Sequence, residues 1–336
     1  MKTHKILLLC GGDGTEHEIS LLSARFLASQ LSQLDNIEIV HVEIHHHQWL
    51  DINTRKAYQL GTDGILRGED NAIQIDYAIP CIHGYPGETG DIQSLLSMAN
   101  LPYLGCDAES SMLCFNKISS KLWFDALNIS NTPYLFLTAD TLESHQNSAH
   151  AALKNWSEVF VKAACQGSSV GCYHVKNEKS LHQAIDNAFH YSKQVLIEKA
   201  LKARELEVAA YIYNNELQIT PPGEILTDKN GDFYTYDEKY SSDSRCSTSL
   251  EAQDLTTEQL KKIHYFAHTA FVQLGLKDLS RIDFFLTEEG DIYLNEINTF
   301  PGMTPISMFP KLLQHNGHSF IEFLQQAIFT ALNKKD

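Results

Sequence analysis

A short apolar run near the start of the chain, residues 6–10, passes directly into a glycine-rich loop at residues 11–15. A run of this length without polar alternation is typical of a strand buried on both faces, and we expect a strand at residues 5–10. Leucines at helical spacing follow it, and further strands are predicted at residues 37–44 and 77–82. Strands that alternate with helices favour a mostly parallel sheet whose glycine loops lie where such sheets bind ligands.

The alternation of predicted strands and helices changes after residue 105 and again after residue 201. The 336 residues therefore divide into three regions: 1–105, 106–201 and 202–336. For the central region we predict an α+β module with a helix at 110–127, a strand at 132–137, a short helix ending near Trp156, a strand at 158–164, a helix at 178–192 and a strand at 194–201. For the last region we predict a strand from Leu206 to Ile212, a helix at 256–274, a hairpin of 279–287 and 291–298, and a helix at 319–332.

Residues 227–248 are polar and show no periodicity. A structureless segment of this length inside a compact domain is usually functional or disordered, and we interpret it as a mobile loop that closes over a site.

The predicted hairpin carries the most informative side chains. Alternate residues of a strand share a face, so Arg281 and Asp283 should lie on the same side as Glu296 and Asn298. Two carboxylates and an amide are ligands that Mg²⁺ accepts when it keeps positions for water and phosphate. The alternative is a solvated face with a structural pair of Arg281 and Asp283.

A second candidate element is the loop at residues 167–171, which contains two glycines and two serines and follows Lys162. Small residues let backbone amides approach phosphate oxygens, although such a loop can also merely connect a hairpin. The loop does not match Gly-x-x-x-x-Gly-Lys-Ser/Thr, so it is not a Walker-type phosphate loop. Lys117 and Lys239, judged alone, are surface lysines.

Glu16 opens the first predicted helix directly after a glycine loop, where a carboxylate suits a substrate ammonium. His83 follows a strand and is either a site histidine or a turn residue. The run His45-His46-His47 is better explained as a solvated strand end than as a metal site, because consecutive strand residues point to opposite faces.

The formal net charge of −16 disfavours nucleic acid and anionic membrane surfaces as partners. Seven cysteines show no Cys-x-x-Cys pair, which indicates free thiols in a reducing compartment. Neither a signal peptide nor a membrane span is predicted. We therefore expect a soluble cytoplasmic protein.

Taken together and in order, these motifs resemble the D-alanine–D-alanine ligases of the ATP-grasp superfamily, over nearly the whole chain. The matching segments are residues 11–12 and 16–20, 83–84, 87–88 and 92–93, 116–117 and 120–121, 161–162 and 167–171, 195–199 and 204–205, 233–234 and 239–240, 281–298, 299 and 301–304, and 307. The resemblance implies an ATP-grasp fold of the α/β and α+β classes, with a parallel-sheet N-terminal domain, a small α+β central domain and a larger α+β C-terminal domain.

The resemblance also implies roles for individual residues. ATP would be held by Lys117, Lys162, Ser169, Glu198, Lys199, Leu201, Glu205 and Lys239. Two Mg²⁺ ions, with Mn²⁺ as a substitute, would be held by Asp283, Glu296 and Asn298. The amino acids and the reacting groups would be handled by Glu16, Ser168, Tyr240, Arg281, Gly302 and Ser307.

The implied reaction joins two D-alanines for peptidoglycan precursor synthesis. A carboxylate is a poor electrophile, so ATP would first convert one D-alanine to an acyl phosphate, and the amine of the second would then displace phosphate. An acyl phosphate must be shielded from water, which fits the loop at residues 227–248 as a lid. The family also implies a homodimer.

Four positions depart from the usual family pattern: Thr89, Ser94, Asn116 and Ala163. None is a ligand in this scheme, but they leave the second substrate open. The alternatives are a ligase that uses D-serine or D-lactate as second substrate, a ligase of another carboxylate and amine, and a non-catalytic nucleotide-binding regulator. The Lys239-Tyr240 pair favours D-alanine in both positions.

Overall fold

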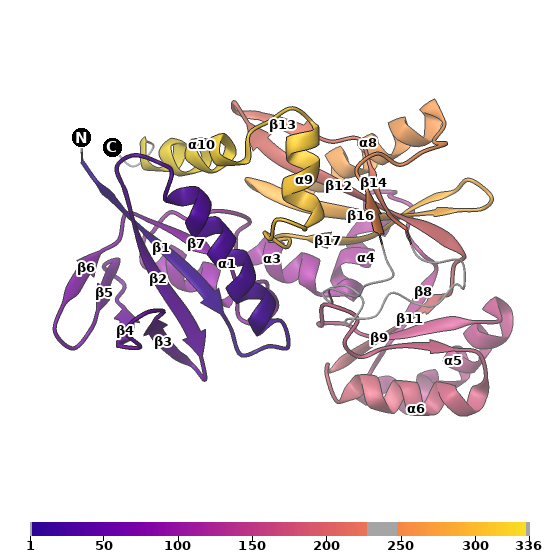
Figure 1. Cartoon of the computed structure of the whole chain (residues 1–336). Helices are drawn as coiled ribbons and strands as arrows, with labels where there is room; N and C mark the ends of the chain where they lie inside the picture. Colours follow the sequence, from indigo (N-terminus) through magenta and orange to yellow (C-terminus); the bar gives the residue numbers. More distant parts are fainter. Residues whose placement is uncertain (1, 227–246, 334–336) are drawn as a thin grey trace.

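The computed structural model describes residues 2–226 and 247–333, which form three sheets with helices around them (Figure 1). The first sheet has the order β6-β5-β4-β3-β2-β1-β7. At one end of this sheet β1 (His4–Gly11) pairs in parallel with β2 (Ile37–His45) and with the edge strand β7 (Tyr77–Pro80). These parallel pairs were predicted, with the glycine loop at the carboxyl end of β1, but the sheet as a whole is mixed rather than mostly parallel because its other ladders are antiparallel.

Four short antiparallel strands extend this sheet beyond β2, and the sequence did not reveal them. They are β3 (Gln48–Asp51), β4 (Ala57–Leu60), β5 (Ile65–Arg67) and β6 (Ala72–Gln74). The strand predicted at residues 77–82 is present as β7, which ends at Pro80, and four unpredicted strands lie between it and β2 in the sequence. Strands of three or four partly exposed residues are too short to show a periodic pattern.

Helices cover both faces of the first sheet. Helix α1 (His17–Leu31) packs Leu27 and Leu31 against one face of β1, and α2 (Asp91–Met98) packs against the other. Strand β1 is buried on both faces, as its apolar run predicts.

The helix predicted at residues 110–127 is in fact two helices, α3 (Ala108–Phe115) and α4 (Lys117–Ala126). Asn116 separates them in an extended conformation with ψ of 102°, and its side chain accepts hydrogen bonds from the amides of Ile118 and Ser119. Apolar periodicity continues across the break, so only the capping asparagine signals it.

The central sheet is antiparallel, with the order β10-β9-β11-β8. Its strands are β8 (Tyr134–Thr138), β9 (Val159–Ala163), β10 (Cys172–Val175) and β11 (Gln194–Lys199). A 3-10 turn (Ala139–Thr141) leads into α5 (Leu142–Trp156), which with α6 (Glu178–Phe189) covers one face. Helix α5 is longer than predicted and β10 was not predicted, because polar residues interrupt the apolar periodicity of both segments.

The third sheet has the order β15-β14-β12-β16-β17, with β13 also paired to β12. Its strands are β12 (Ala203–Tyr213), β13 (Glu216–Ile219), β14 (Gly223–Leu226), β15 (Ser247–Ser249), β16 (Leu279–Thr287) and β17 (Ile292–Asn298). Helix α8 (Thr257–Gln273) packs on one face, while α9 (Met308–His315) and α10 (Phe320–Asn333) pack on the other.

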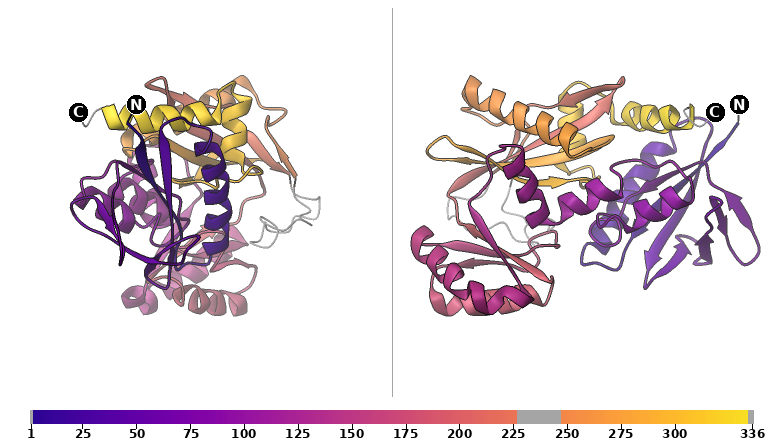
Figure 2. Two further views of the ribbon diagram at one scale, coloured as in Figure 1. Left: turned by 60° about the vertical axis from the view of Figure 1, so that its left-hand side comes forward. Right: turned by 180° about the vertical axis from the view of Figure 1, so that it is seen from behind.

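The first and third sheets share one hydrophobic core. Side chains of α1 meet those of α10, where the rings of Phe26 and Phe320 stack with centroids 5.6 Å apart. In the views of Figures 1 and 2 the central sheet and its helices lie apart from this core, below the third sheet. Among the described helices, none combines the length and apolar character needed to cross a membrane.

Candidate active site

The predicted acidic cluster lies on the hairpin of β16 and β17. In its register Asp283 is opposite Glu296 and Arg281 is opposite Asn298. The amide nitrogen of Asn298 donates to Asp283 Oδ2 at 3.0 Å, so these side chains do share one face. A ladder irregularity next to Asp283 ends the regular alternation at this point.

Arg281 forms the structural pair that was the alternative interpretation. Its Nε and Nη2 donate to the two Asp283 oxygens at 2.8 and 2.7 Å, and Nε lies 3.4 Å from Glu207. Burial disfavours the charged guanidinium, but these carboxylates outweigh it and raise the pKa of Arg281 well above its usual value. The pair is part of the site rather than an alternative to it, because Arg281 and Asp283 border the same cavity.

Lys117 is the first residue of α4, and its backbone amide donates to the carbonyl of Ala164 beyond β9. Its ammonium group donates to the carbonyl of Gln166 at 2.7 Å and lies 3.6 Å from Glu296 Oε2. A lysine that the sequence alone presented as a surface residue is thus fixed between the loop of residues 167–171 and the acidic cluster.

Glu198 is buried in the central sheet between two lysines. Its carboxylate oxygens lie 2.5 Å from Lys121 Nζ and 2.5 Å from Lys162 Nζ. Burial opposes ionisation, yet the two ammonium groups prevail and lower the pKa of Glu198 to about 2. The same carboxylate raises the pKa of Lys162 against its own burial.

Of the other residues expected near the nucleotide, Glu205 and Ser169 line a cavity, whereas Lys199 and Leu201 line neither cavity of the site. Lys199 ends β11 with an exposed side chain, and Leu201 follows it half-buried. Glu205 on β12 and Ser169 both line a cavity of about 90 Å³, together with Lys117, Lys162, Asp283 and Glu296. This small cavity therefore gathers groups from α4, the central sheet and the third sheet.

The loop of residues 167–171 reaches back to the first sheet. Ser168 Oγ donates to Glu16 Oε1 at 2.5 Å, across 152 residues of chain. A Cβ at Gly167 would stand 2.5 Å from Glu16 Oε2, so a larger residue there would displace the Glu16 carboxylate from its present position. Glu16 itself precedes α1 and is buried.

Beyond β17, Ser307 precedes α9 and its hydroxyl is held in a turn. The Oγ atom lies 2.8 Å from Thr304 Oγ1 and accepts from the Thr304 amide at 3.1 Å. A Cβ at Gly302 would stand 2.8 Å from Ser307 Oγ. Gly302, Ser307, Glu16, Ser168 and Arg281 all line one cavity of about 350 Å³, which also includes Lys117 and Glu296.

Two of the expected residues, Lys239 and Tyr240, lie outside the described residues, as does most of the predicted lid at 227–248.

Three residues of the site were missed or left open by sequence reasoning. His83 is buried, with Nε2 3.0 Å from Ser23 Oγ and Nδ1 3.2 Å from the carbonyl of Phe300, which makes it a site histidine. Lys121 is as buried as Glu198, and a lysine within an amphipathic helix gives no sign of this.

Glu88 is the third such residue. Its Oε2 accepts from the Gly84 amide at 2.8 Å, and it lines the larger cavity. Burial raises its pKa to about 8, the charge of Glu16 adds to this, and the Gly84 amide opposes it. Its position in a glycine-rich turn directly after a strand was the available signal.

The donor chemistry of the site fits a phosphorylated ligand with a hard divalent cation. Asp283 and Glu296 adjoin Lys117 and Lys162 at the smaller cavity, and Asn298, which is hydrogen-bonded to Asp283, lines the larger one. Carboxylate and amide oxygens beside ammonium groups are the combination that binds Mg²⁺ and phosphate together. The neighbouring cavity offers a buried carboxylate for an ammonium group and a hydroxyl-bearing turn for a carboxylate.

Comparisons with known proteins agree with this chemistry. Residues 5–106 match the family model "D-ala D-ala ligase N-terminus" and residues 123–329 match "D-ala D-ala ligase C-terminus". A relative from Aliivibrio fischeri (strain MJ11), named D-alanine--D-alanine ligase, is 62% identical over 98% of this chain and 99% of its own length.

Solved structures are similarly close. The crystal structure of D-alanyl-alanine synthetase A from Vibrio cholerae superposes with a TM-score of 0.94 at 52% identity, and the match covers 99% of both chains. That of D-alanine-D-alanine ligase from Aeromonas hydrophila superposes with a TM-score of 0.83 at 53% identity, over 96% of this chain and 99% of the other.

Proposed function

The chain belongs to the D-alanine–D-alanine ligase family, and from this premise we propose that it joins two D-alanines with ATP through a D-alanyl phosphate. Its fold is the ATP-grasp arrangement of α/β and α+β parts that the sequence predicts. The product would be D-alanyl-D-alanine, a peptidoglycan precursor, with release of ADP and phosphate.

One observation carries the proposal. A single cavity of about 350 Å³ borders both a pair of amino-acid-binding groups, Glu16 with Ser168, and the cationic and acidic groups around Lys117 and Glu296. An amino acid held by its ammonium group at Glu16 would thus present its carboxylate toward the phosphate-binding side.

In the first half-reaction, the carboxylate of the first D-alanine attacks the γ-phosphorus of ATP, and ADP leaves. Lys117 and Lys162 neutralise charge on the phosphates, while Ser169 and its loop donate hydrogen bonds. Further contacts to the nucleotide come from the remaining residues of its site: Glu198, Lys199, Leu201 and Glu205. Asp283, Glu296 and Asn298 would hold two Mg²⁺ ions, or Mn²⁺ in their place, which supply positive charge to the transferred phosphoryl group.

In the second half-reaction, the amine of the second D-alanine attacks the acyl carbon. Ser307 binds its carboxylate, and Arg281 with the backbone amide of Gly302 stabilises the oxyanion that develops on the acyl oxygen. The attack forms the carbon–nitrogen bond, and collapse of the intermediate breaks the bond between the acyl carbon and the phosphate oxygen. With the loss of a proton from the nitrogen to solvent, the new bond is the peptide bond and phosphate leaves. Lys239 and Tyr240, outside the described residues, would complete the site when the lid at residues 227–248 closes.

We extend the proposal to the organisation of the protein. Its three domains would comprise residues 1–105, 106–201 and 202–336, and the protein would act as a homodimer in the cytoplasm. Its substrates are small molecules, and neither nucleic acid nor membrane lipid takes part.

The test is phosphate release by the purified protein with ATP, Mg²⁺ and single or paired amino or hydroxy acids, with each product identified by its mass. We expect D-alanine alone to sustain release and to give the dipeptide. If phosphate is released only when D-serine or D-lactate is also present, the protein is a ligase that joins D-alanine to that second substrate. If D-alanine does not stimulate phosphate release, the assignment as a D-alanine ligase is wrong.

A matched pair of variants tests the first amino-acid pocket. Ser168→Ala removes the hydroxyl that donates to Glu16 and should raise the KM for the first D-alanine about tenfold, the effect of one charge-assisted hydrogen bond. Ser180→Ala, at the start of α6, should leave this KM unchanged. Equal KM values for Ser168→Ala and the unchanged protein would place the ammonium group elsewhere.

A further inference from the structure

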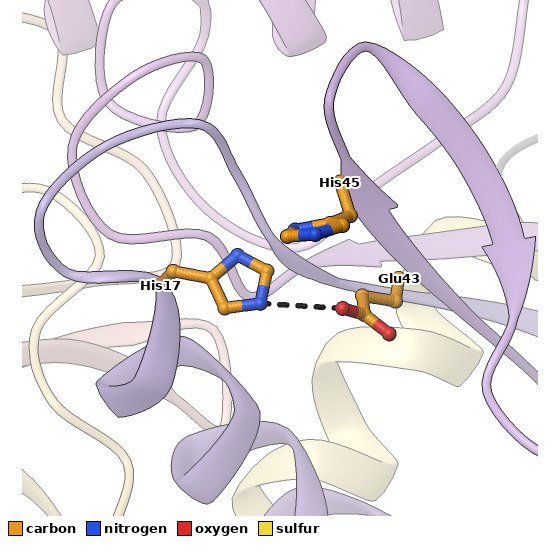
Figure 3. A group of neighbouring side chains, drawn as sticks. All are labelled: His17, Glu43 and His45. Carbon is orange, nitrogen blue, oxygen red and sulfur yellow. Dashed lines mark ion pairs between the residues drawn. The ribbon is translucent and has the colours of Figure 1, made fainter.

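A second cluster of ligating side chains lies on the first sheet, formed by His17, Glu43 and His45 (Figure 3). Glu43 and His45 are two residues apart on β2 and therefore point from the same face, and His17 comes from the first turn of α1. One ligand atom from each lies within 4.8 Å of the others.

The orientation of His17 is fixed by its other ring nitrogen. Nδ1 lies 2.7 Å from the carbonyl of Gly12, an acceptor only, so Nδ1 carries a proton and donates it. Nε2 is then the nitrogen that is directed toward Glu43, 3.2 Å from Oε1. A histidine whose second nitrogen donates to a backbone carbonyl is the usual arrangement of a metal ligand.

This contact places two electron-rich atoms opposite each other. With Nδ1 protonated, Nε2 of the neutral ring has only a lone pair to offer to a carboxylate oxygen. The contact is favourable only when a cation, a proton or a metal ion, lies between the two atoms. Arg55 pairs with the other oxygen, Oε2, and so leaves Oε1 as the available ligand.

Burial distinguishes the cluster from an ordinary surface pair. The side chain of Glu43 is 8% exposed and that of His17 is 17% exposed, so neither is freely solvated. The His45 ring is half-buried and contacts the His17 ring at 5.0 Å between centroids, and it has no hydrogen-bond partner among the described residues.

We propose that His17 Nε2, Glu43 Oε1 and His45 bind one divalent transition-metal ion of the Zn²⁺ class, apart from the ligase site. Two imidazoles and one carboxylate form a ligand set that Zn²⁺ takes with a fourth position left to water. Imidazole nitrogen also selects against Mg²⁺, which prefers oxygen donors such as those of the hairpin.

The proposed site differs from the run of three histidines that the sequence shows. His46 and His47 lie in a turn with positive φ, and their backbone amides donate to the carboxylate of Asp13. Only His45 of the run belongs to the site, so the argument against a metal bound by consecutive histidines holds. The other two ligands are Glu43, two residues before His45 on β2, and His17 of α1.

The experiment is calorimetric titration of the reduced full chain with Zn²⁺, in saturating Mg²⁺ and ADP so that the ligase site is filled. We expect one Zn²⁺ per chain. Co²⁺ as a spectroscopic probe should give visible bands of a nitrogen and oxygen site without the near-ultraviolet charge-transfer band of a thiolate. A thiolate band would assign the ion to cysteine, such as Cys10 nearby, and would overturn the proposal.

Variants locate the ion independently of any activity. His45→Ala and Glu43→Gln should each weaken Zn²⁺ affinity about tenfold or more. His174→Ala removes an imidazole from another pair, where Nε2 lies 2.7 Å from Glu158, and should leave the affinity unchanged. Because Glu43 is buried, His45→Ala decides the matter if Glu43→Gln does not fold. Two results would overturn the proposal: a Zn²⁺ affinity of His45→Ala equal to that of the unchanged chain, or no Zn²⁺ bound to the unchanged chain. In either case a proton alone joins His17 to Glu43.

Discussion

The carboxylate of Glu198 lies between the ammonium groups of Lys121 and Lys162, and this charge cluster is buried. Glu198→Gln would leave two lysines without a counter-charge, so we expect the free energy of unfolding to fall by about 3–5 kcal/mol. Denaturant titration measures it. Glu158→Gln is the control, since that carboxylate is 42% exposed beside His174 and Lys176, and should cost less than about 1 kcal/mol. Similar losses in both variants would contradict the buried cluster.

Glu88 gives the unliganded protein a characteristic pH dependence. Its pKa is about 8 in the folded state against an ordinary 4.5, because burial and Glu16 favour the protonated form. The folded state therefore keeps a proton that the unfolded state loses, and stability should fall as pH rises from about 4.5 to about 8. Glu88→Gln cannot ionise and should flatten this decline in unfolding free energies measured across that range. An unchanged slope would mean that Glu88 is ionised when folded.

At this scale the sequence led to two residues that line cavities in the structure, Glu16 and Asp283. A carboxylate after a glycine loop, and alternating acids on a hairpin, indicated Glu16 and Asp283 from the sequence alone. Lys121 could not be found in this way, because its burial depends on a partner 77 residues away on β11. The pairing of Arg281 with Asp283 was weighed as an alternative to the site, whereas the structure includes both in it.

At the scale of elements, the break between α3 and α4 determines where Lys117 stands. Asn116 caps α4 through two backbone amides, so Asn116→Ala should lower the free energy of unfolding by about 1 kcal/mol. It should also raise the KM for ATP severalfold, because Lys117 is the next residue. Thermal unfolding and ATP kinetics measure the two effects.

The control is Asn177→Ala. Asn177 caps α6 by accepting from the Ser180 amide at 3.0 Å, and it borders neither cavity of the site. We expect a similar loss of stability with no change in the KM for ATP. A KM change in both variants, or in neither, would show that the cap does not position Lys117.

Elements with long periodic patterns were predicted well, and short ones were not. The buried strand β1, helix α8 and the hairpin of β16 and β17 lie within a residue or two of their predicted bounds. Their apolar residues repeat often enough to define a period. Strands β3 to β6 and helix α9 are too short for this, and their formation depends on neighbours along the sheet or core.

At the scale of the whole molecule, the site lies where three sheets meet. Glu16 lies in the loop between β1 and α1, Ser168 in the loop between β9 and β10, and Lys162 on β9. Arg281 and Asp283 lie on β16 of the third sheet. No local pattern could show that these segments converge. The order of motifs along the chain could show it, because a resemblance over the whole chain implies that the segments are arranged in space as they are in the family.

The net charge of −16 is not distributed evenly over the molecule. Lys117, Lys162 and Arg281 are separated in sequence but line adjoining cavities. The acidic excess of the chain therefore coexists with a local cationic group, which is what a phosphate-binding site requires.

The transfer of oxygen tests the central claim, activation of the first D-alanine as an acyl phosphate. D-Alanine labelled with ¹⁸O in both carboxylate oxygens is converted with ATP and Mg²⁺, and the released phosphate is analysed by mass. The attacking carboxylate oxygen stays bonded to phosphorus when the amine displaces phosphate, so we predict one ¹⁸O atom in each phosphate released. Phosphate without the label, alongside dipeptide formation, would contradict the account.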